Sequence, residues 1–101
     1  MVRHVVMFKF LPEAEGRTAL ENAEHGKMML EKLQGVVPTL KRSEVHINAP
    51  EACRDNCELV LIADFDGFDE LNEYIVHPEH KKVGEFMKKV REFRSCVDFE
   101  I

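Results

Sequence analysis

The sequence has 101 residues, of which 45% are hydrophobic and 33% are charged, and its formal net charge is -5. This length suits one domain with a modest core, and this composition is typical of a globular chain. An acidic domain is a poor partner for nucleic acid or for anionic lipid, so we expect neither. No apolar run approaches the ~20 residues of a membrane span, and the start does not resemble a secretion signal. We therefore expect a cytoplasmic protein with a single domain over residues 1–101.

Hydrophobic periodicity divides the first half of the chain into a strand, a helix and a second strand. Residues 2–10 alternate, with His4 on the more apolar side, and this predicts a strand. Apolar residues, Leu20 among them, recur at spacings of three and four over residues 13–34, which predicts an amphipathic helix. Residues 40–48 are more polar and form the second predicted strand.

The second half repeats this order with its most apolar strand at residues 57–65. Asp66 and Asp69 resemble a capping box, which predicts the start of a short helix. Pro78 disfavours the continuation of that helix and suits the first position of a new one. The new helix carries an apolar stripe that we expect to include Phe93.

A last strand over residues 94–101 completes two β-α-β units. Two such units predict an α+β fold of ferredoxin-like topology, a four-stranded antiparallel sheet with the helices on one face. The other face then exposes Val5, Met7, Val60 and Ile62, and the chain has nothing left to cover them. The simplest cover is the same face of a second copy, so we expect a homodimer through the sheet face.

The chain has an odd number of cysteines, Cys53, Cys57 and Cys96, and their spacing matches no zinc or redox motif. We read them as reduced thiols and expect no metal and no cofactor, with a metal role beside His46 as the minor alternative.

Three polar rings are predicted to point into one apolar space between the sheet and the helices: His4, Tyr74 and His80. Apolar walls with a few convergent polar groups are what a small-molecule pocket needs. His80 lies in the first turn of its helix, where its cationic form is disfavoured, so it suits a general base. The Tyr74 hydroxyl suits a donor to a developing oxyanion. The residues expected to bind the ligand are His4, Val6, Phe8, Leu30 and Leu61.

The same rings have a structural interpretation, because a buried His or Tyr often only satisfies a backbone carbonyl or a neighbour. For His77, at the bend before Pro78, we favour such a role as the cap of the next helix. His25 and His46 lie on polar stretches and are expected to be solvated. Lys88 and the other lysines of the last helix are expected to form a wet outer surface.

The segments that carry these residues resemble the stress-responsive dimeric α/β-barrel (Dabb) family. The resemblance starts at Arg3–Phe10 and is strongest at Tyr74–His80, which reads Y-x-x-H-P-x-H. It covers nearly the whole chain and implies a ferredoxin-like protomer in a dimer whose sheets form a barrel. Relation to a plant member, olivetolic acid cyclase, implies His80 as the general base, Tyr74 as its assistant and His4 in the pocket. Leu59 replaces a further histidine of the cyclase, which implies a different ligand.

Three functions therefore remain open. The first is a small-molecule pocket, with binding or cofactor-independent chemistry of cyclase or lyase type at His80 and Tyr74. The second is a non-catalytic homodimer of stress or scaffold type. The third and weakest is a heme-degrading monooxygenase, in which an inward histidine supplies the axial ligand.

Overall fold

The computed structural model describes all 101 residues as one sheet, a small hairpin and a layer of helices. The elements in chain order are β1 (Val2–Phe10), β2 (Glu13–Ala14), β3 (Arg17–Thr18), α1 (Ala19–Glu31), β4 (Arg42–Ile47), β5 (Leu59–Phe65), α2 (Phe68–Val76), α3 (Pro78–Val90) and β6 (Arg91–Glu100). The main sheet has the order β4-β5-β1-β6, and all its neighbouring strands are antiparallel. This arrangement confirms the predicted ferredoxin-like α+β fold.

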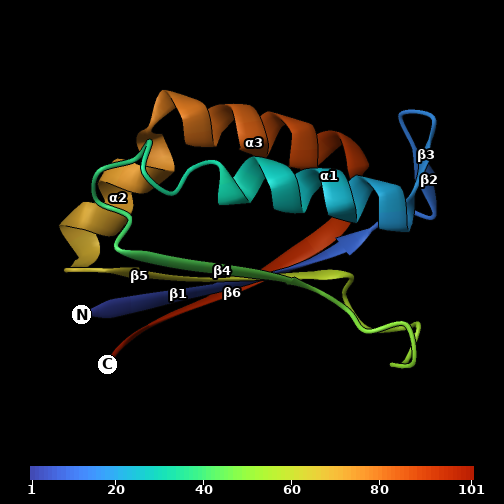
Figure 1. Cartoon of the computed structure of the whole chain (residues 1–101), viewed down its shortest axis with the longest axis horizontal. Coiled ribbons are helices and arrows are strands. Elements are labelled where there is room, and N and C mark those ends of the chain that lie inside the picture. Colours follow the sequence, from blue (N-terminus) through green and yellow to red (C-terminus); the bar gives the residue numbers. More distant parts are fainter.

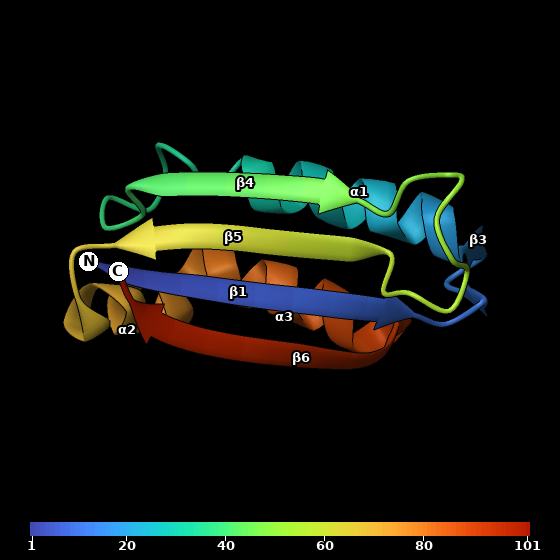
Figure 2. The same ribbon diagram turned by 90° about the horizontal axis from the view of Figure 1, so that it is seen from below.

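The helices form one layer over one face of the sheet, and the other face is bare (Figure 1). Figure 2 shows that bare face, with the helices visible only behind the strands. None of the helices has the length and apolar character that a membrane crossing requires.

Strand β1 lies in the middle of the sheet, between β5 and β6. Its burial alternates as its sequence predicts, because successive side chains of a strand point to opposite faces. Val2, Val6, Phe8 and Phe10 enter the core beneath the helices. His4 shares that face and is only 4% exposed.

The bare face carries the other residues of the central strands, Val5 and Met7 from β1 and Val60 and Ile62 from β5. The register of β6 adds two apolar residues to this face, because Val97 lies opposite Val5 and Phe99 lies opposite Arg3. The residues that we call the open apolar face are Val5, Met7, Val60, Ile62, Val97 and Phe99.

The first helix begins later than predicted. Residues 13–18 form the β2-β3 hairpin, in which Gly16 adopts a φ of 75°. The helix then starts after Thr18, whose side chain accepts from the backbone of Glu21 while the Glu21 side chain accepts from the backbone of Thr18. This capping box satisfies two orphan groups of the helix start. Leu20 is consequently 53% exposed, and its predicted place in the core is wrong.

The predicted start of α2 is also wrong in detail. Gly67 is the N-cap, and no side chain caps the helix, so Asp66 does not form the expected capping box. At the other end, α3 stops at Val90 and β6 follows at once. Phe93 therefore belongs to the strand and is 48% exposed instead of lying on the inner stripe of the helix.

A buried ion pair links β1 to β5. The Arg3 guanidinium donates to both carboxylate oxygens of Asp64, at 2.8 and 3.0 Å. Asp64 is 4% exposed. The hydrogen bonds from Arg3 hold the pKa of the Asp64 carboxyl below its ordinary value, against the opposing effect of burial. The charged carboxylate is therefore the form that the fold prefers.

The Asp64→Asn substitution should lower the free energy of unfolding at pH 7 by about 1–3 kcal/mol, because it leaves the Arg3 fork without its carboxylate. A lowered pKa in the folded state stabilises the fold above pH ~4, and this contribution disappears as the pH falls through the folded-state value. The difference between wild type and variant, measured by urea denaturation at fixed protein concentration, should thus shrink in acid. Asp66→Asn is the control, since Asp66 is exposed, and it should change stability by less than about 0.5 kcal/mol. A difference that is equal at pH 7 and pH 3 would contradict this account.

Candidate functional site

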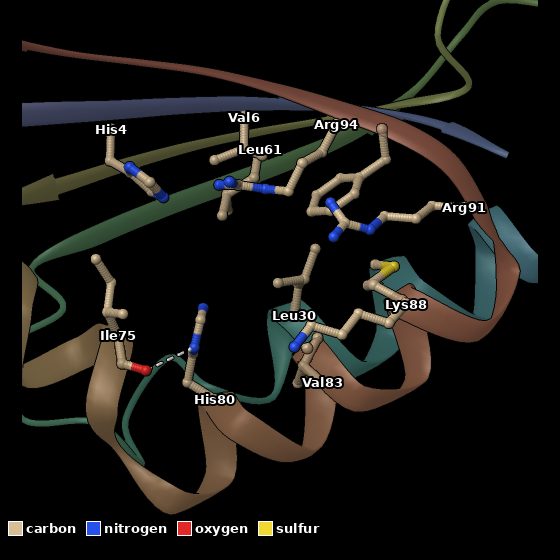
Figure 3. Close-up of a pocket in the computed structure, with 13 residues that line it drawn as sticks. His4, Val6, Leu30, Leu61, Ile75, His80, Val83, Lys88, Arg91 and Arg94 are labelled. Atoms are coloured by element: carbon tan, nitrogen blue, oxygen red, sulfur yellow. Dashed lines mark hydrogen bonds between the residues drawn. The ribbon is translucent and has the colours of Figure 1, made fainter.

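A cavity of about 280 Å³ lies between the sheet and α3. Its lining residues are His4, Val6, Phe8, Leu30, Leu61, Ile75, His80, Val83, Gly84, Met87, Lys88, Arg91 and Arg94 (Figure 3). The structure thus brings together His80 and every residue for which ligand binding was predicted. Most of the wall is apolar, with polar groups at a few points, which is the usual make-up of a small-molecule site.

The break between α2 and α3 determines where His80 points. In a continuous helix, the Ile75 carbonyl would accept from the backbone N–H of Glu79. Pro78 moves His77 to extended geometry (φ -61°, ψ 135°), and the Glu79 N–H is instead capped by His77 Nδ1 at 3.1 Å. The Ile75 carbonyl is left free, and His80 Nδ1 lies 3.1 Å from its oxygen. The imidazole of His80 therefore satisfies the end of α2.

This contact also determines the tautomer of His80. A carbonyl oxygen only accepts hydrogen bonds, so Nδ1 of His80 carries a proton and donates to Ile75. In the neutral ring, Nε2 then has a free lone pair, and Figure 3 shows this second nitrogen facing the cavity. Burial lowers the pKa of His80, and the charges of His4, Arg94 and His77 lower it further, while the Ile75 hydrogen bond opposes them. His80 is accordingly a neutral acceptor at pH 7.

His4 faces His80 from the opposite wall, on β1. Its Nδ1 lies 2.5 Å from a carboxylate oxygen of Asp98, which is the neighbour of His4 on β6. A carboxylate at that distance holds Nδ1 as a donor and orients the ring. The other nitrogen of His4 points into the cavity (Figure 3). Two imidazoles from distant parts of the chain thus present a ring nitrogen to the same space.

Tyr74 lies behind these two rings and does not line the cavity. It is 1% exposed, and its ring centroid is 4.5 Å from that of His80, 5.0 Å from that of Phe65 and 6.4 Å from that of His4. Burial raises the pKa of its hydroxyl, so the group stays protonated at neutral pH. In this structure Tyr74 packs against the imidazoles and supports their orientation.

Three cationic residues of the wall were not predicted from the sequence: Lys88, Arg91 and Arg94. Lys88 is exposed as expected, and its side chain also borders the cavity. Arg91 belongs to the sheet because β6 begins three residues earlier than predicted, whereas Arg94 lies within the predicted strand and its place beside the cavity was overlooked. The alternation of the last strand could have identified Arg94, because this residue lies opposite Phe8 on the side that faces the helices.

His25 is also less solvated than expected, since its ring packs 4.8 Å from that of Phe86 and lies away from the cavity.

His4, Cys96 and Asp98 place three possible metal ligands within 4.8 Å of one another. Metal ligation needs a thiolate, but burial and the charge of Asp98 raise the pKa of the Cys96 thiol. In addition, Nδ1 of His4 already bonds to Asp98. The group is better explained as a support for His4 than as a metal centre, and the absence of a metal stays a prediction.

Gly26 of α1 lets the cavity keep its size. A Cβ atom at this position would lie 2.5 Å from Cε and 3.3 Å from Sδ of Met87, which lines the cavity. Any side chain at position 26 would displace the Met87 thioether, because such a distance lies far inside van der Waals contact. The absence of a side chain on α1 therefore determines where this wall stands.

Comparison with known proteins agrees with this architecture. A family model described as the stress responsive A/B barrel domain matches residues 2–101. A dimeric ferredoxin-like protein of unknown function from Bacteroides fragilis is similar over 99% of this chain and 95% of its own, with 28% identity and a TM-score of 0.86. Another from Thermobifida fusca covers 99% and 90%, with 25% identity and a TM-score of 0.82.

A hydroxynitrile lyase from Passiflora edulis shares the fold alone, with 14% identity, a TM-score of 0.79, and coverage of 99% of this chain and 92% of its own. No curated protein matches the sequence significantly.

The protonation state of His80 can be measured directly. Titration of the imidazole resonances by NMR should give His80 a pKa below the ordinary value of about 6.5, because burial disfavours its cation. The His80→Gln variant, which lacks the resonance, identifies the signal. A midpoint above pH ~7 would remove His80 as a neutral base under physiological conditions.

Proposed function

Because the chain belongs to the stress responsive A/B barrel domain family, we propose that it binds a small organic molecule in the cavity and performs acid–base chemistry on it with His80. One observation carries this proposal: ring nitrogens of His80 and His4 face the same apolar space. An imidazole that is neutral at pH 7 suits a general base, because its free ring nitrogen can accept a proton.

The two histidines suit complementary tasks. His80 Nε2 takes a proton from the bound molecule, because its Nδ1 is held by Ile75. His4, whose Nδ1 is held by Asp98, presents its other ring nitrogen to the same molecule and suits orienting it through a hydrogen bond. Tyr74 fixes the rings from behind. This chemistry is of lyase or cyclase type and asks for no metal or cofactor.

The alternative is a non-catalytic scaffold, in which the same rings only complete the core. The observation in its favour is that Nδ1 of each imidazole already has a partner within the chain. The two readings differ in what the His80→Ala substitution does.

If His80 serves a ligand, His80→Ala should abolish turnover or weaken binding by at least about tenfold, and it should change stability little because the ring is only half-buried. Thermal melts of both proteins against aromatic and β-keto compounds, each as the acid and as its neutral amide or ester, provide the measurement, because a ligand of the native state raises Tm. Lys81→Ala is the control, since Lys81 is the exposed neighbour of His80 on α3 and does not line the cavity.

Equal shifts of Tm in wild type and His80→Ala would place binding elsewhere and remove the proposal. A loss of stability of about 1–3 kcal/mol in His80→Ala, with no compound effective on the wild type, would favour the scaffold.

We also propose that the protein is a homodimer through the open apolar face. The dimeric descriptions of the similar structures support this assembly. In the isolated chain, Met7 is 43% exposed, Val97 55% and Phe99 41%. A contiguous apolar patch of this kind is a usual sign of an interface. The same face on a second copy is self-complementary about a two-fold axis.

Ile62→Lys should convert the dimer to monomer or unfold it, because it buries an unpaired charge at the centre of the interface. Light scattering at micromolar concentration gives the mass. Glu24→Lys, on the exposed side of α1, controls for the change in charge and should remain dimeric. A monomeric mass for the wild type would refute the assembly.

A further inference from the structure

One end of the cavity is cationic. Arg91 and Arg94 come from β6, on the side of the sheet that faces the helices, since they lie opposite Phe10 and Phe8. Lys88 comes from the last turn of α3 and completes this end. In Figure 3 the charged ends of the two arginines extend over the cavity from the sheet, and Lys88 does so from the helix. No acidic residue lines the cavity.

These cations have no carboxylate partner within the chain, although Arg94 lies within hydrogen-bonding reach of the Cys96 thiol. None of the ion pairs of the structure involves Lys88, Arg91 or Arg94. Three other arginines have partners, since Arg3 binds Asp64, Arg42 binds Glu44, and Arg54 donates to backbone carbonyls, whereas Arg17 has no ion pair. The chain has 19 acidic residues against 14 Lys and Arg. Although carboxylates are in excess in the chain, none of them lines the cavity beside these cations.

All three cations would attract an anion bound at this end. Lys88 and Arg94 are exposed and Arg91 is partly buried, so solvent screens their mutual repulsion and its cost is modest. The charge of Arg94 also reaches His80, where it disfavours the imidazolium. A bound anion would remove both penalties, and the planar fork of arginine matches a carboxylate in particular.

We propose that the ligand of this cavity is an organic acid, whose carboxylate is held by Lys88, Arg91 and Arg94 while its apolar body lies against Val6, Leu30 and Leu61. This inference rests on the small-molecule site proposed above and names the class of its ligand. It also assigns an orientation: the acid group lies at the β6 end, and the body of the molecule extends toward the ring nitrogens of His4 and His80.

A structural explanation competes with this one, because cations on an edge strand protect a sheet against pairing with other chains. β6 is such an edge. If the cations only protect the edge, their charge has no effect on a bound molecule. If the proposal holds, the same charge attracts the carboxylate of the ligand. A pair of probes that differ only in charge separates the two explanations.

The probes are 3-phenylpropanoate and its neutral amide, 3-phenylpropanamide, titrated into the full-length protein by isothermal calorimetry. The wild type should bind the acid at least about tenfold more tightly than the amide. Arg94→Gln and Lys88→Gln should each reduce this preference to about twofold or less, with little effect on the amide. Lys89→Gln is the matched control, because Lys89 is the neighbour of Lys88 on α3 and does not line the cavity; it should keep the full preference. Thermal melts of the variants verify that each one is folded.

Equal affinity of the wild type for acid and amide would overturn the proposal, and so would binding of neither probe at millimolar concentration. An equal loss in Lys88→Gln and Lys89→Gln would also overturn it, because the preference would then reflect net charge alone. These failures are distinct from failure of the proposed function. Neutral compounds that raise Tm in wild type but not in His80→Ala would keep the acid–base site and remove only the organic acid.

Discussion

The rest of the structure depends on the position of β1 between two partner strands, with helices on one side only. A central strand in such a sheet needs apolar residues on both faces, and β1 has them. One face supplies His4, Val6 and Phe8 to the cavity. The other supplies Val5 and Met7 to the open apolar face. The candidate site and the proposed interface are thus opposite sides of the same nine-residue strand, so a slip of one residue in its register would exchange them.

The segment from Tyr74 to His80 shows how a broken helix builds a site. A proline inside a helix is usually a cost, because it removes a hydrogen bond and forces a bend. Here the freed carbonyl of Ile75 and the freed N–H of Glu79 are satisfied by the imidazoles of His80 and His77. The Y-x-x-H-P-x-H pattern therefore has a physical explanation that does not depend on catalysis. The proposed acid–base chemistry uses the one ring nitrogen of His80 that this arrangement leaves free.

The sequence was most informative where a single period runs through an element. Alternation over β1 predicted its bounds and its buried face, and with them the wall residues His4, Val6 and Phe8. The apolar patterns of β5 and α1 predicted the wall residues Leu61 and Leu30. Prediction failed at junctions, where periods change. Helical spacing alone extended α1 across residues 13–18, and α3 across Arg91 and Phe93, so Arg91 was missed as a cavity residue. The burial of Tyr74 behind the imidazoles depends on tertiary packing, which periodicity does not contain.

The residue at position 26 can change the size of the cavity although it does not line the cavity. It stands outside the wall, yet a single methyl group there would displace the end of Met87, which lines the cavity. Relatives can therefore diverge in the length of molecule they accept through a position that a comparison of contact residues would overlook. The histidines can stay the same while the ligand changes.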